Sequence, residues 1–268
     1  ILGNIYVAKV RNIVKNINAA FVEFAKGQMG YLPLTGQIAP IHTDGTPRND
    51  DRILIGDELI VQVTKEAVKT KPPTVSCAIE LPGRYAVLTR KNGIVTSVSK
   101  KIQDEDKREN LRCILQEYAG ESYGFVARTN SASCEEMTFR GEIEGLVKQY
   151  EQITKQGIHR TVYSVLYRAA DGYLSQIRDS LGGQSTGILT DDEELYAQIQ
   201  TYLEAGGLQD SMPLTLWDPD HGKMDAVYDI SRTIEKVLRP KVWLRGGGYL
   251  IIQPTEALIA IDVNTGKA

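Results

Sequence analysis

The sequence predicts an α+β chain made of more than one module, and three observations support this. The first third consists of short apolar runs separated by Gly, Asn and Asp, a pattern typical of strands and turns. From residue 104 onward, apolar residues recur at helical spacing. The chain has 268 residues, of which 42% are hydrophobic and 24% charged. This is an ordinary globular balance, and the length is enough for about two domains.

Five short strands are expected in the first 82 residues. Apolar and polar residues alternate in the first run, and Gly27 and Gly30 mark a turn between the second and the third. The expected strands are 5–10, 19–24, 31–32, 59–63 and 74–81. The segment 35–51 has the composition of a loop. Five short strands with turns of this kind indicate a small Greek-key barrel of the OB type.

Strands and helices alternate in the middle of the sequence. Two strands at 85–89 and 94–99 are expected to form a hairpin around Asn92-Gly93, a strong hairpin signal. Asp104 opens a helix, and a short strand follows at 124–128. Ser133 and Glu136 have the spacing of a capping box, which predicts a second helix that ends near Gly157.

The last third predicts helices first and strands last. Apolar spacing indicates helices near 174–181, 195–203 and 227–237, the second ended by Gly206-Gly207 and the third by Pro240. A short buried strand is expected at 187–189, and further strands at 242–244, 249–252 and 258–263. The Gly246–Gly248 run is expected to be a tight turn, because no helix and no Lys-Ser/Thr pair follows it.

Three aromatic or basic residues of the barrel are candidates for binding nucleic acid. Phe21 and Tyr31 lie on consecutive expected strands, and Lys71 precedes the last one. Outward aromatic rings on such a barrel stack on single-stranded bases, at about 1–3 kcal/mol per base. The alternative, that both rings belong to the core, stays open from spacing alone.

A localised phosphate site is the second candidate. The segment from Gly83 to Lys101 has no acidic residue and carries five cations, which predicts a basic face. The cations are Arg84, Arg90, Lys91, Lys100 and Lys101. Arg128 offers two parallel hydrogen bonds to a phosphate, and Thr129 adds a hydroxyl and a backbone N–H. The alternative is a solvated pair of strands.

The third candidate is a carboxylate in the tail. Asp262 ends an apolar strand, and Asn264 has the same parity, so both should point to one side. A charge next to a core needs a partner, and Mg²⁺ is one that takes oxygen ligands. The alternative is a strand-terminal Asp that caps the next turn.

The remaining composition excludes several classes of protein. Three cysteines without C-x-x-C spacing and three scattered histidines argue against a zinc site and for small buried thiols in a reducing cytoplasm. No apolar run approaches the roughly 20 residues of a membrane helix. The net charge of −3 argues against uniform binding of polyanions. Because the sequence begins with Ile1 rather than a methionine and stops abruptly, we expect a piece of a longer protein.

Several segments together resemble the bacterial ribonuclease E/G endoribonucleases. GNIY at 3–6, AFV at 20–22 and GYLPL at 30–34 resemble the family's RNA-binding barrel, of the type first seen in ribosomal protein S-one. Three further matches are IELPGRY at 79–85, GFVART at 124–129 and TEALIAIDVN at 255–264. The first two resemble parts of the family's 5′-phosphate sensor, and the third resembles its segment with the first catalytic carboxylate. Each match is weak alone, but their order and spacing are specific.

The resemblance implies a role for each matching residue. Phe21 and Tyr31 would stack on RNA bases, with Lys71 near the backbone. Asp262 would be catalytic and ligate Mg²⁺, with Asn264 at the scissile phosphate. The implied pocket for a 5′-monophosphate is lined by Gly83, Val87, Lys100, Arg128 and Thr129. The family usually has Arg at position 100, so Lys100 would not grip the phosphate with two hydrogen bonds.

The resemblance also implies an order of modules. These are the OB-type barrel (1–82), the 5′-sensor module (83–161), an incomplete α/β RNase H-like subdomain into which the barrel is inserted (162–250), and the first strand of a DNase I-like catalytic subdomain (251–268). The family's second metal-binding Asp has no counterpart here. The whole protein is therefore expected to be a cytoplasmic, homo-oligomeric, Mg²⁺-dependent endoribonuclease of RNA processing and decay, and this chain to be inactive alone.

Single-stranded, 5′-monophosphorylated RNA is the expected partner. The main alternative is a non-catalytic OB-fold RNA-binding module in which the remaining residues are scaffold, and a protein-interaction scaffold is a third possibility. The C-terminal segment 255–264 distinguishes the enzyme from the RNA-binding module, because only the enzyme hypothesis explains Asp262 together with Asn264.

Overall fold

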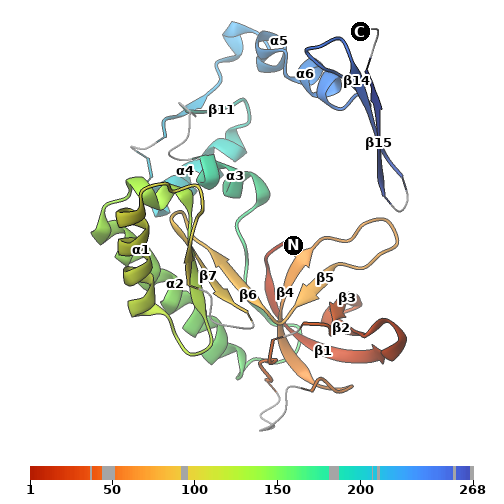
Figure 1. Ribbon diagram of the computed structural model, residues 1–268, viewed down its shortest axis with the longest axis vertical. Coiled ribbons are helices and arrows are strands. Elements are labelled where there is room, and N and C mark those ends of the chain that lie inside the picture. Colours follow the sequence, from red (N-terminus) through yellow and green to blue (C-terminus); the bar gives the residue numbers. More distant parts are fainter. Residues whose placement is uncertain are drawn as a thin grey trace. The chain divides into compact units, whose positions relative to one another are not determined.

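The computed structural model describes residues 1–36, 38–43, 52–91, 96–180, 187–206, 208–209, 212–255 and 258–265. They fall into two compact units, Ile1–Gly183 and Gln184–Ala268 (Figure 1). The boundaries predicted at 82, 161 and 250 stay predictions.

A closed five-stranded barrel begins the first unit. Its strands are β1 (Ile5–Val14), β2 (Ala19–Ala25), β3 (Gln28–Pro33), β4 (Glu58–Lys65) and β5 (Thr74–Ser76), with a 3₁₀ turn at Lys15–Ile17. They pair in the order β1-β2-β3-β5-β4, and a β1–β4 pairing closes the ring. Only β3 and β5 run parallel among these pairs. This arrangement is consistent with the predicted OB-type barrel.

Alternation along the strands fills the barrel. Ala20, Val22 and Phe24 of β2 are buried, whereas the residues between them are half-buried. Successive side chains of a strand point to opposite faces, so one face of β2 forms core and the other faces outward. The barrel core is completed by residues of the other strands, among them Leu32, Leu59 and Val75.

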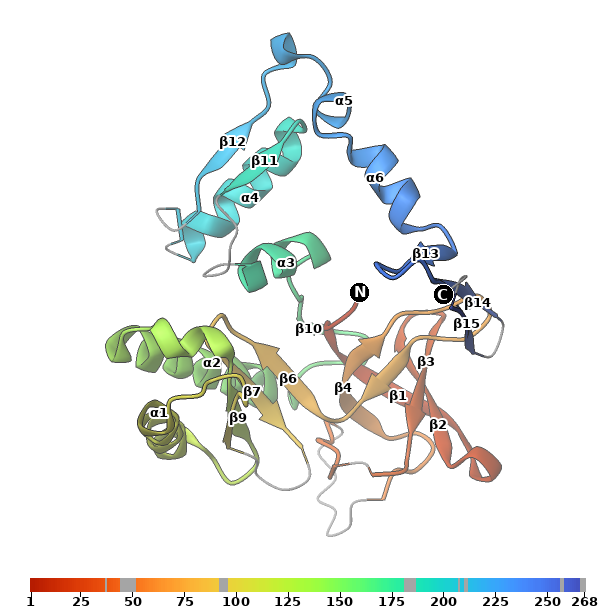
Figure 2. The ribbon, with the colours of Figure 1, turned by 45° about the horizontal axis from the view of Figure 1, so that its top comes forward.

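A second sheet with two helices follows in the same unit (Figure 2). Its strands are β6 (Ile79–Pro82), β7 (Ala86–Arg90), β8 (Ser97–Val98) and β9 (Gly124–Ala127), in the order β6-β7-β9-β8. The helices α1 (Glu105–Tyr118) and α2 (Glu136–Gly157) pack on it. Leu115, Phe125, Phe139 and Ile143 are fully buried between them. The unit ends with β10 (Val165–Tyr167), which pairs with β1, and α3 (Gly172–Ser180).

The predicted strand 74–81 is two strands, and the predicted hairpin is wrong. The chain leaves the barrel after β5 and enters the second sheet at β6. The Gln62 side chain joins the two, because it donates to the Glu80 carbonyl (2.9 Å) and accepts from the Glu80 N–H (2.7 Å). β9 lies between β7 and β8, and β8 runs parallel to β9. Asn92-Gly93 lies outside the described residues.

The helix ends test the capping predictions. Asp104 caps α1 as predicted, since its Oδ1 accepts from the Lys107 N–H (3.1 Å). The capping box is wrong, because Ser133 belongs to a 3₁₀ turn (Thr129–Ser133) and its hydroxyl donates to the Asn130 carbonyl (3.3 Å). The Gly157 end of α2 is confirmed. Of the cysteines, Cys77 is buried as predicted, Cys113 is exposed and Cys134 is intermediate.

The second unit contains two small sheets. β11 (Ile188–Thr190) and β12 (Leu214–Leu216) run parallel and pack with α4 (Glu193–Ala205). A 3₁₀ turn (Pro219–His221), α5 (Met224–Tyr228) and α6 (Ile230–Val237) lead to β13 (Lys241–Trp243), β14 (Tyr249–Pro254) and β15 (Ile259–Asn264), which pair in that order. An RNase H-like identity for this part stays a prediction.

Two details of this unit differ from the prediction and one agrees. The predicted helix 227–237 divides at Asp229, whose φ of 52° is left-handed, and β11 is mostly half-buried rather than fully buried. The Gly246–Gly248 turn is tight as predicted, because the Leu244 N–H donates to the Gly248 carbonyl (2.8 Å) and Gly247 has a φ of 85°. In the described part of the chain, no helix has the length and apolar character to cross a membrane.

Candidate functional site

The strand order brings the predicted phosphate residues to one end of the second sheet. β7 is antiparallel to both β6 and β9, and β8 is parallel to β9. The C-terminal ends of β6, β8 and β9 therefore meet the beginning of β7. The predicted residues at this end are Gly83, Val87, Lys100, Arg128 and Thr129.

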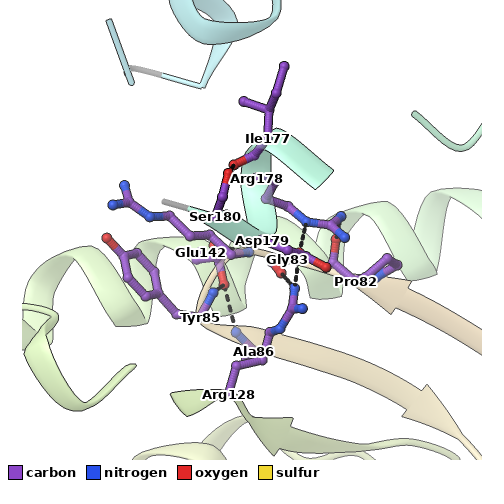
Figure 3. Close-up of polar contacts among 11 residues, drawn as sticks. Pro82, Gly83, Tyr85, Ala86, Arg128, Glu142, Ile177, Arg178, Asp179 and Ser180 are labelled. Carbon is purple, nitrogen blue, oxygen red and sulfur yellow. Dashed lines mark hydrogen bonds and ion pairs between the residues drawn. The ribbon is translucent and has the colours of Figure 1, made fainter. Parts of the chain in front are cut away.

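Arg128 lies at the centre of this end of the sheet (Figure 3). Its Nη1 donates to the Gly83 carbonyl (2.9 Å), and its backbone N–H donates to the Tyr85 carbonyl (2.7 Å). The neighbouring Thr129 is exposed and its hydroxyl lies 3.0 Å from that of Ser99. Lys100, the next residue after Ser99, is exposed. The sheet thus gathers a guanidinium, a hydroxyl and an ammonium-bearing residue, the donor types that a phosphate accepts from.

Glu142 of α2 shapes the turn between β6 and β7, a role that the sequence did not reveal. Its carboxylate accepts from three consecutive backbone N–H groups, those of Arg84 (2.8 Å), Tyr85 (2.7 Å) and Ala86 (2.9 Å). A Cβ on Gly83 would lie 2.6 Å from Glu142 Oε1. The turn therefore needs glycine at position 83 so that the carboxylate can approach.

Asp179 of α3 is a second residue that the sequence did not reveal. Its Oδ1 lies 2.8 Å from Arg128 Nη1 and 3.0 Å from Arg178 Nε, and Arg178 also donates to the Pro82 carbonyl (2.9 Å) (Figure 3). Burial alone would raise the pKa of Asp179, but the hydrogen bonds from Arg128 and Arg178 outweigh it and hold this pKa below its ordinary value. An anion that binds Arg128 would compete with this carboxylate for the guanidinium.

The five cations of the 83–101 segment do not form one basic face, contrary to the prediction. Arg90 is buried, and its guanidinium donates to the carbonyls of Cys77 (3.2 Å) and Ala39 (2.7 Å). Lys91 pairs with Glu80. The guanidinium of Arg84 lies 4.9 Å from the centre of the Tyr85 ring. The spacing of these cations in the sequence did not indicate that their side chains have different partners.

The barrel presents Phe21 and Tyr31 side by side on its outer face. The two residues pair directly across β2 and β3, with ring centres 6.0 Å apart at 69°. Both are half-buried, and neither belongs to the barrel core, so the core alternative is wrong. Lys71 is exposed on the β4–β5 connection, two residues before Pro73, whose carbonyl accepts from the Tyr31 N–H (2.8 Å).

Asp262 and Asn264 point to the same side of β15, as predicted. Asn264 Nδ2 donates to Asp262 Oδ2 (2.8 Å). Asp262 is exposed and lies within β15, so the expectation of a strand-end charge beside a core is wrong. The turn that Asp262 would cap in the alternative interpretation falls on residues 266–268, which lie outside the described residues.

The described residues do not by themselves fit a magnesium ion. Mg²⁺ takes six oxygen ligands in octahedral geometry, and Asp262 with Asn264 offers one carboxylate and one amide. Within the residues that the structure describes, no three His, Cys, Asp or Glu side chains gather closely enough to hold a metal ion.

Comparisons with known proteins agree on one family. Residues 80–268 match the model of the Ribonuclease E/G family. The chain is 31% identical to Ribonuclease E of Nostoc sp. over 99% of its own length and 39% of that protein. It is 27% identical to Ribonuclease G of Haemophilus influenzae, covering 99% of the chain and 55% of that relative. It is also 27% identical to Ribonuclease E of Escherichia coli, covering 99% of the chain and 26% of that relative.

Proposed function

This chain belongs to the Ribonuclease E/G family, and we propose that it is the RNA-binding and 5′-end-sensing part of an endoribonuclease that acts on single-stranded RNA. The chain spans between about a quarter and just over half of the relatives described above. The observation that carries the proposal is the placement of Arg128 and Thr129 at the sheet end that the β6–β7 turn also reaches.

The barrel binds the RNA strand by stacking on its bases. Phe21 and Tyr31 offer two neighbouring ring surfaces, and every base has a π-face that can stack on them. Lys71 supplies a positive charge near the same strands, suited to the phosphate backbone.

The end of the second sheet binds the 5′-monophosphate. Arg128 supplies hydrogen bonds to the phosphate, Thr129 adds its hydroxyl, and Lys100 adds charge from the β8 end. Gly83 and Val87 form the wall on the side of β6 and β7. Arg128 is already oriented by the Gly83 carbonyl, so little side-chain freedom is lost on binding. A triphosphate carries more charge and bulk than these few donors accommodate.

Asp262 and Asn264 belong to the catalytic part of the whole protein. Asp262 would supply one carboxylate to a Mg²⁺ site of the whole protein, and Asn264 donates a hydrogen bond to that carboxylate. When bound, such an ion polarises a phosphate and supplies a water nucleophile. The predicted cytoplasmic location and homo-oligomeric assembly of the whole protein stay predictions.

The test compares two RNA decamers of equal sequence, one with a 5′-monophosphate and one with a 5′-hydroxyl, by fluorescence anisotropy. We expect tighter binding of the monophosphate by the chain, and a loss of about tenfold or more of that preference in Arg128→Ala, because hydrogen bonds to charged groups are worth about 1.5–3 kcal/mol.

Arg140→Ala is the matched control, since Arg140 is also ion-paired, to Glu117 and Glu136 on the helices. It should keep the preference. Equal binding of both RNAs by the unchanged chain would refute end sensing and favour the alternative, a non-catalytic RNA-binding module in which the barrel alone contacts RNA.

A further inference from the structure

The two faces of the sheet β13-β14-β15 carry side chains of different chemistry. Pairing sets Trp243 opposite Tyr249 and Tyr249 opposite Asn264, and it sets Lys241 opposite Ile251 and Ile251 opposite Asp262. Residues directly opposite each other, or two apart on one strand, share a face. Aromatic, amide and charged groups therefore share the face of Asp262. The other face is aliphatic, with Val242, Leu250, Ile252, Ile261 and Val263.

The aromatic residues on the Asp262 face form a compact cluster in which Trp243 is exposed and Tyr249 is half-buried. The rings of Trp243 and Tyr249 have centres 5.2 Å apart at 62°. Lys241 Nζ lies 4.1 Å from the centre of the Trp243 ring and 3.7 Å from that of Tyr249. Trp243 is 66% exposed. We call Lys241, Trp243 and Tyr249 the tail cluster.

We propose that the tail cluster binds one nucleobase of single-stranded RNA beside the Asp262–Asn264 pair, with Lys241 contacting the adjoining phosphate. This inference rests on the proposed function and adds a substrate-positioning surface to it. Tyr249 lies directly opposite Asn264, so a base stacked on the tail cluster would place its own backbone near the two polar side chains.

The chemistry of the cluster favours RNA over other partners. An exposed indole and a half-buried phenol can stack on any base, at about 1–3 kcal/mol per base. An ammonium group that lies over both rings can turn to a phosphate, since its stem is flexible and its charge is compact. An apolar peptide would bind more favourably to the opposite, aliphatic face of the same sheet.

The experiment uses the 268-residue chain and a 5′-hydroxyl RNA decamer with 4-thiouridine at successive positions. Ultraviolet cross-linking followed by peptide mass spectrometry should recover adducts at Trp243 or Tyr249. In anisotropy titrations, Trp243→Ala should weaken binding at least about fivefold, and Trp243→Phe, which keeps a ring, should recover most of that loss.

Val242→Ala is the control, because Val242 is the neighbour of Trp243 on the opposite face and should leave binding unchanged. Circular dichroism melting checks that each variant is folded. Unchanged affinity in Trp243→Ala, together with no adduct at the cluster, overturns this inference.

The outcome of this experiment can be distinguished from the outcome of the test of the proposed function. RNA binding that depends on Phe21 but not on Trp243 refutes the tail cluster and leaves the proposed function intact. A loss on Trp243→Ala without any preference for a 5′-monophosphate supports the tail cluster and refutes end sensing. A chain that binds no RNA at all overturns both.

Discussion

At the scale of single residues, Asp179 determines whether Arg128 is available. The carboxylate lies 2.8 Å from Arg128 Nη1, the group that we assign to the 5′-phosphate. Asp179→Asn removes the competing negative charge and keeps the shape of the side chain. We expect severalfold tighter binding of 5′-monophosphorylated RNA, because the phosphate no longer displaces an ion pair. Anisotropy titrations measure it, and binding of 5′-hydroxyl RNA should not change. Weaker binding of the monophosphate would mean that Asp179 orients Arg128 instead.

Glu142 is the residue on which the β6–β7 turn depends. Three backbone N–H groups donate to its carboxylate, and Glu142→Ala would leave them without this acceptor. These hydrogen bonds are partly buried, and a fully buried donor without a partner costs about 1–3 kcal/mol. The free energy of unfolding should therefore fall by about 1 kcal/mol or more in urea titrations. Glu144→Ala on the same helix removes one exposed hydrogen bond, from Tyr118, and should cost much less. Equal losses would contradict the role of Glu142.

At the scale of elements, Glu23 joins β2 to two other parts of the first unit. It accepts from Tyr163 Oη (2.6 Å), the Gly27 N–H (2.8 Å) and Arg11 Nε (2.6 Å). These hydrogen bonds, with that of Tyr163 the largest contribution, lower the pKa of Glu23 from 4.5 to about 2. A lowered pKa stabilises the fold above the unfolded value and ceases to do so as the pH falls through the folded value.

The stability difference between the chain and Glu23→Gln should therefore be full above about pH 4.5 and shrink as the pH falls toward 2. Urea titrations at a series of pH values measure this difference. An NMR titration of the Glu23 side chain provides an independent check, and a midpoint near 4.5 would contradict the three hydrogen bonds.

Elements were predictable where their signals are local. The Asp104 cap and the Gly157 end of α2 depend on neighbours within one helical turn, and both are confirmed. The Asn92-Gly93 signal predicted that β7 and β8 pair with each other, but β9, which lies far along the chain, takes the place between them. Hydrogen bonding to a distant strand overrode the local preference.

The residues of the candidate site also divide into those with a local sequence signal and those whose contacts come from distant parts of the chain. Arg128 and Thr129 could be found because they stand in a short motif at the end of a strand. Glu142 reaches the Arg84 N–H across 58 positions of the chain, and Asp179 reaches Arg128 from α3. Nothing in the sequence neighbourhood of either carboxylate indicates these contacts. In the same way, charge along the chain does not reveal which cations are engaged by Glu80 or by backbone carbonyls, so the predicted basic face was wrong.

At the scale of the whole molecule, binding and cleavage should be separable in this chain. Asp262 and Asn264 give a divalent cation one carboxylate and one amide, and the part of the chain that the structure describes gathers no cluster of three His, Cys, Asp or Glu ligands. A single carboxylate holds Mg²⁺ weakly, because the ion gives up its water reluctantly. The aromatic pair on the barrel and the Arg128 end of the second sheet need no metal to contact RNA.

We therefore expect the 268-residue chain to bind single-stranded RNA and to leave it uncut in the presence of Mg²⁺. Denaturing gels of an end-labelled RNA after long incubation measure this directly, with Asp262→Asn as the matched control for traces of a contaminating nuclease. Identical patterns from the chain and the variant fit the expectation. Mg²⁺-dependent cleavage that disappears in Asp262→Asn would instead show that this chain already holds a working catalytic site that requires Asp262.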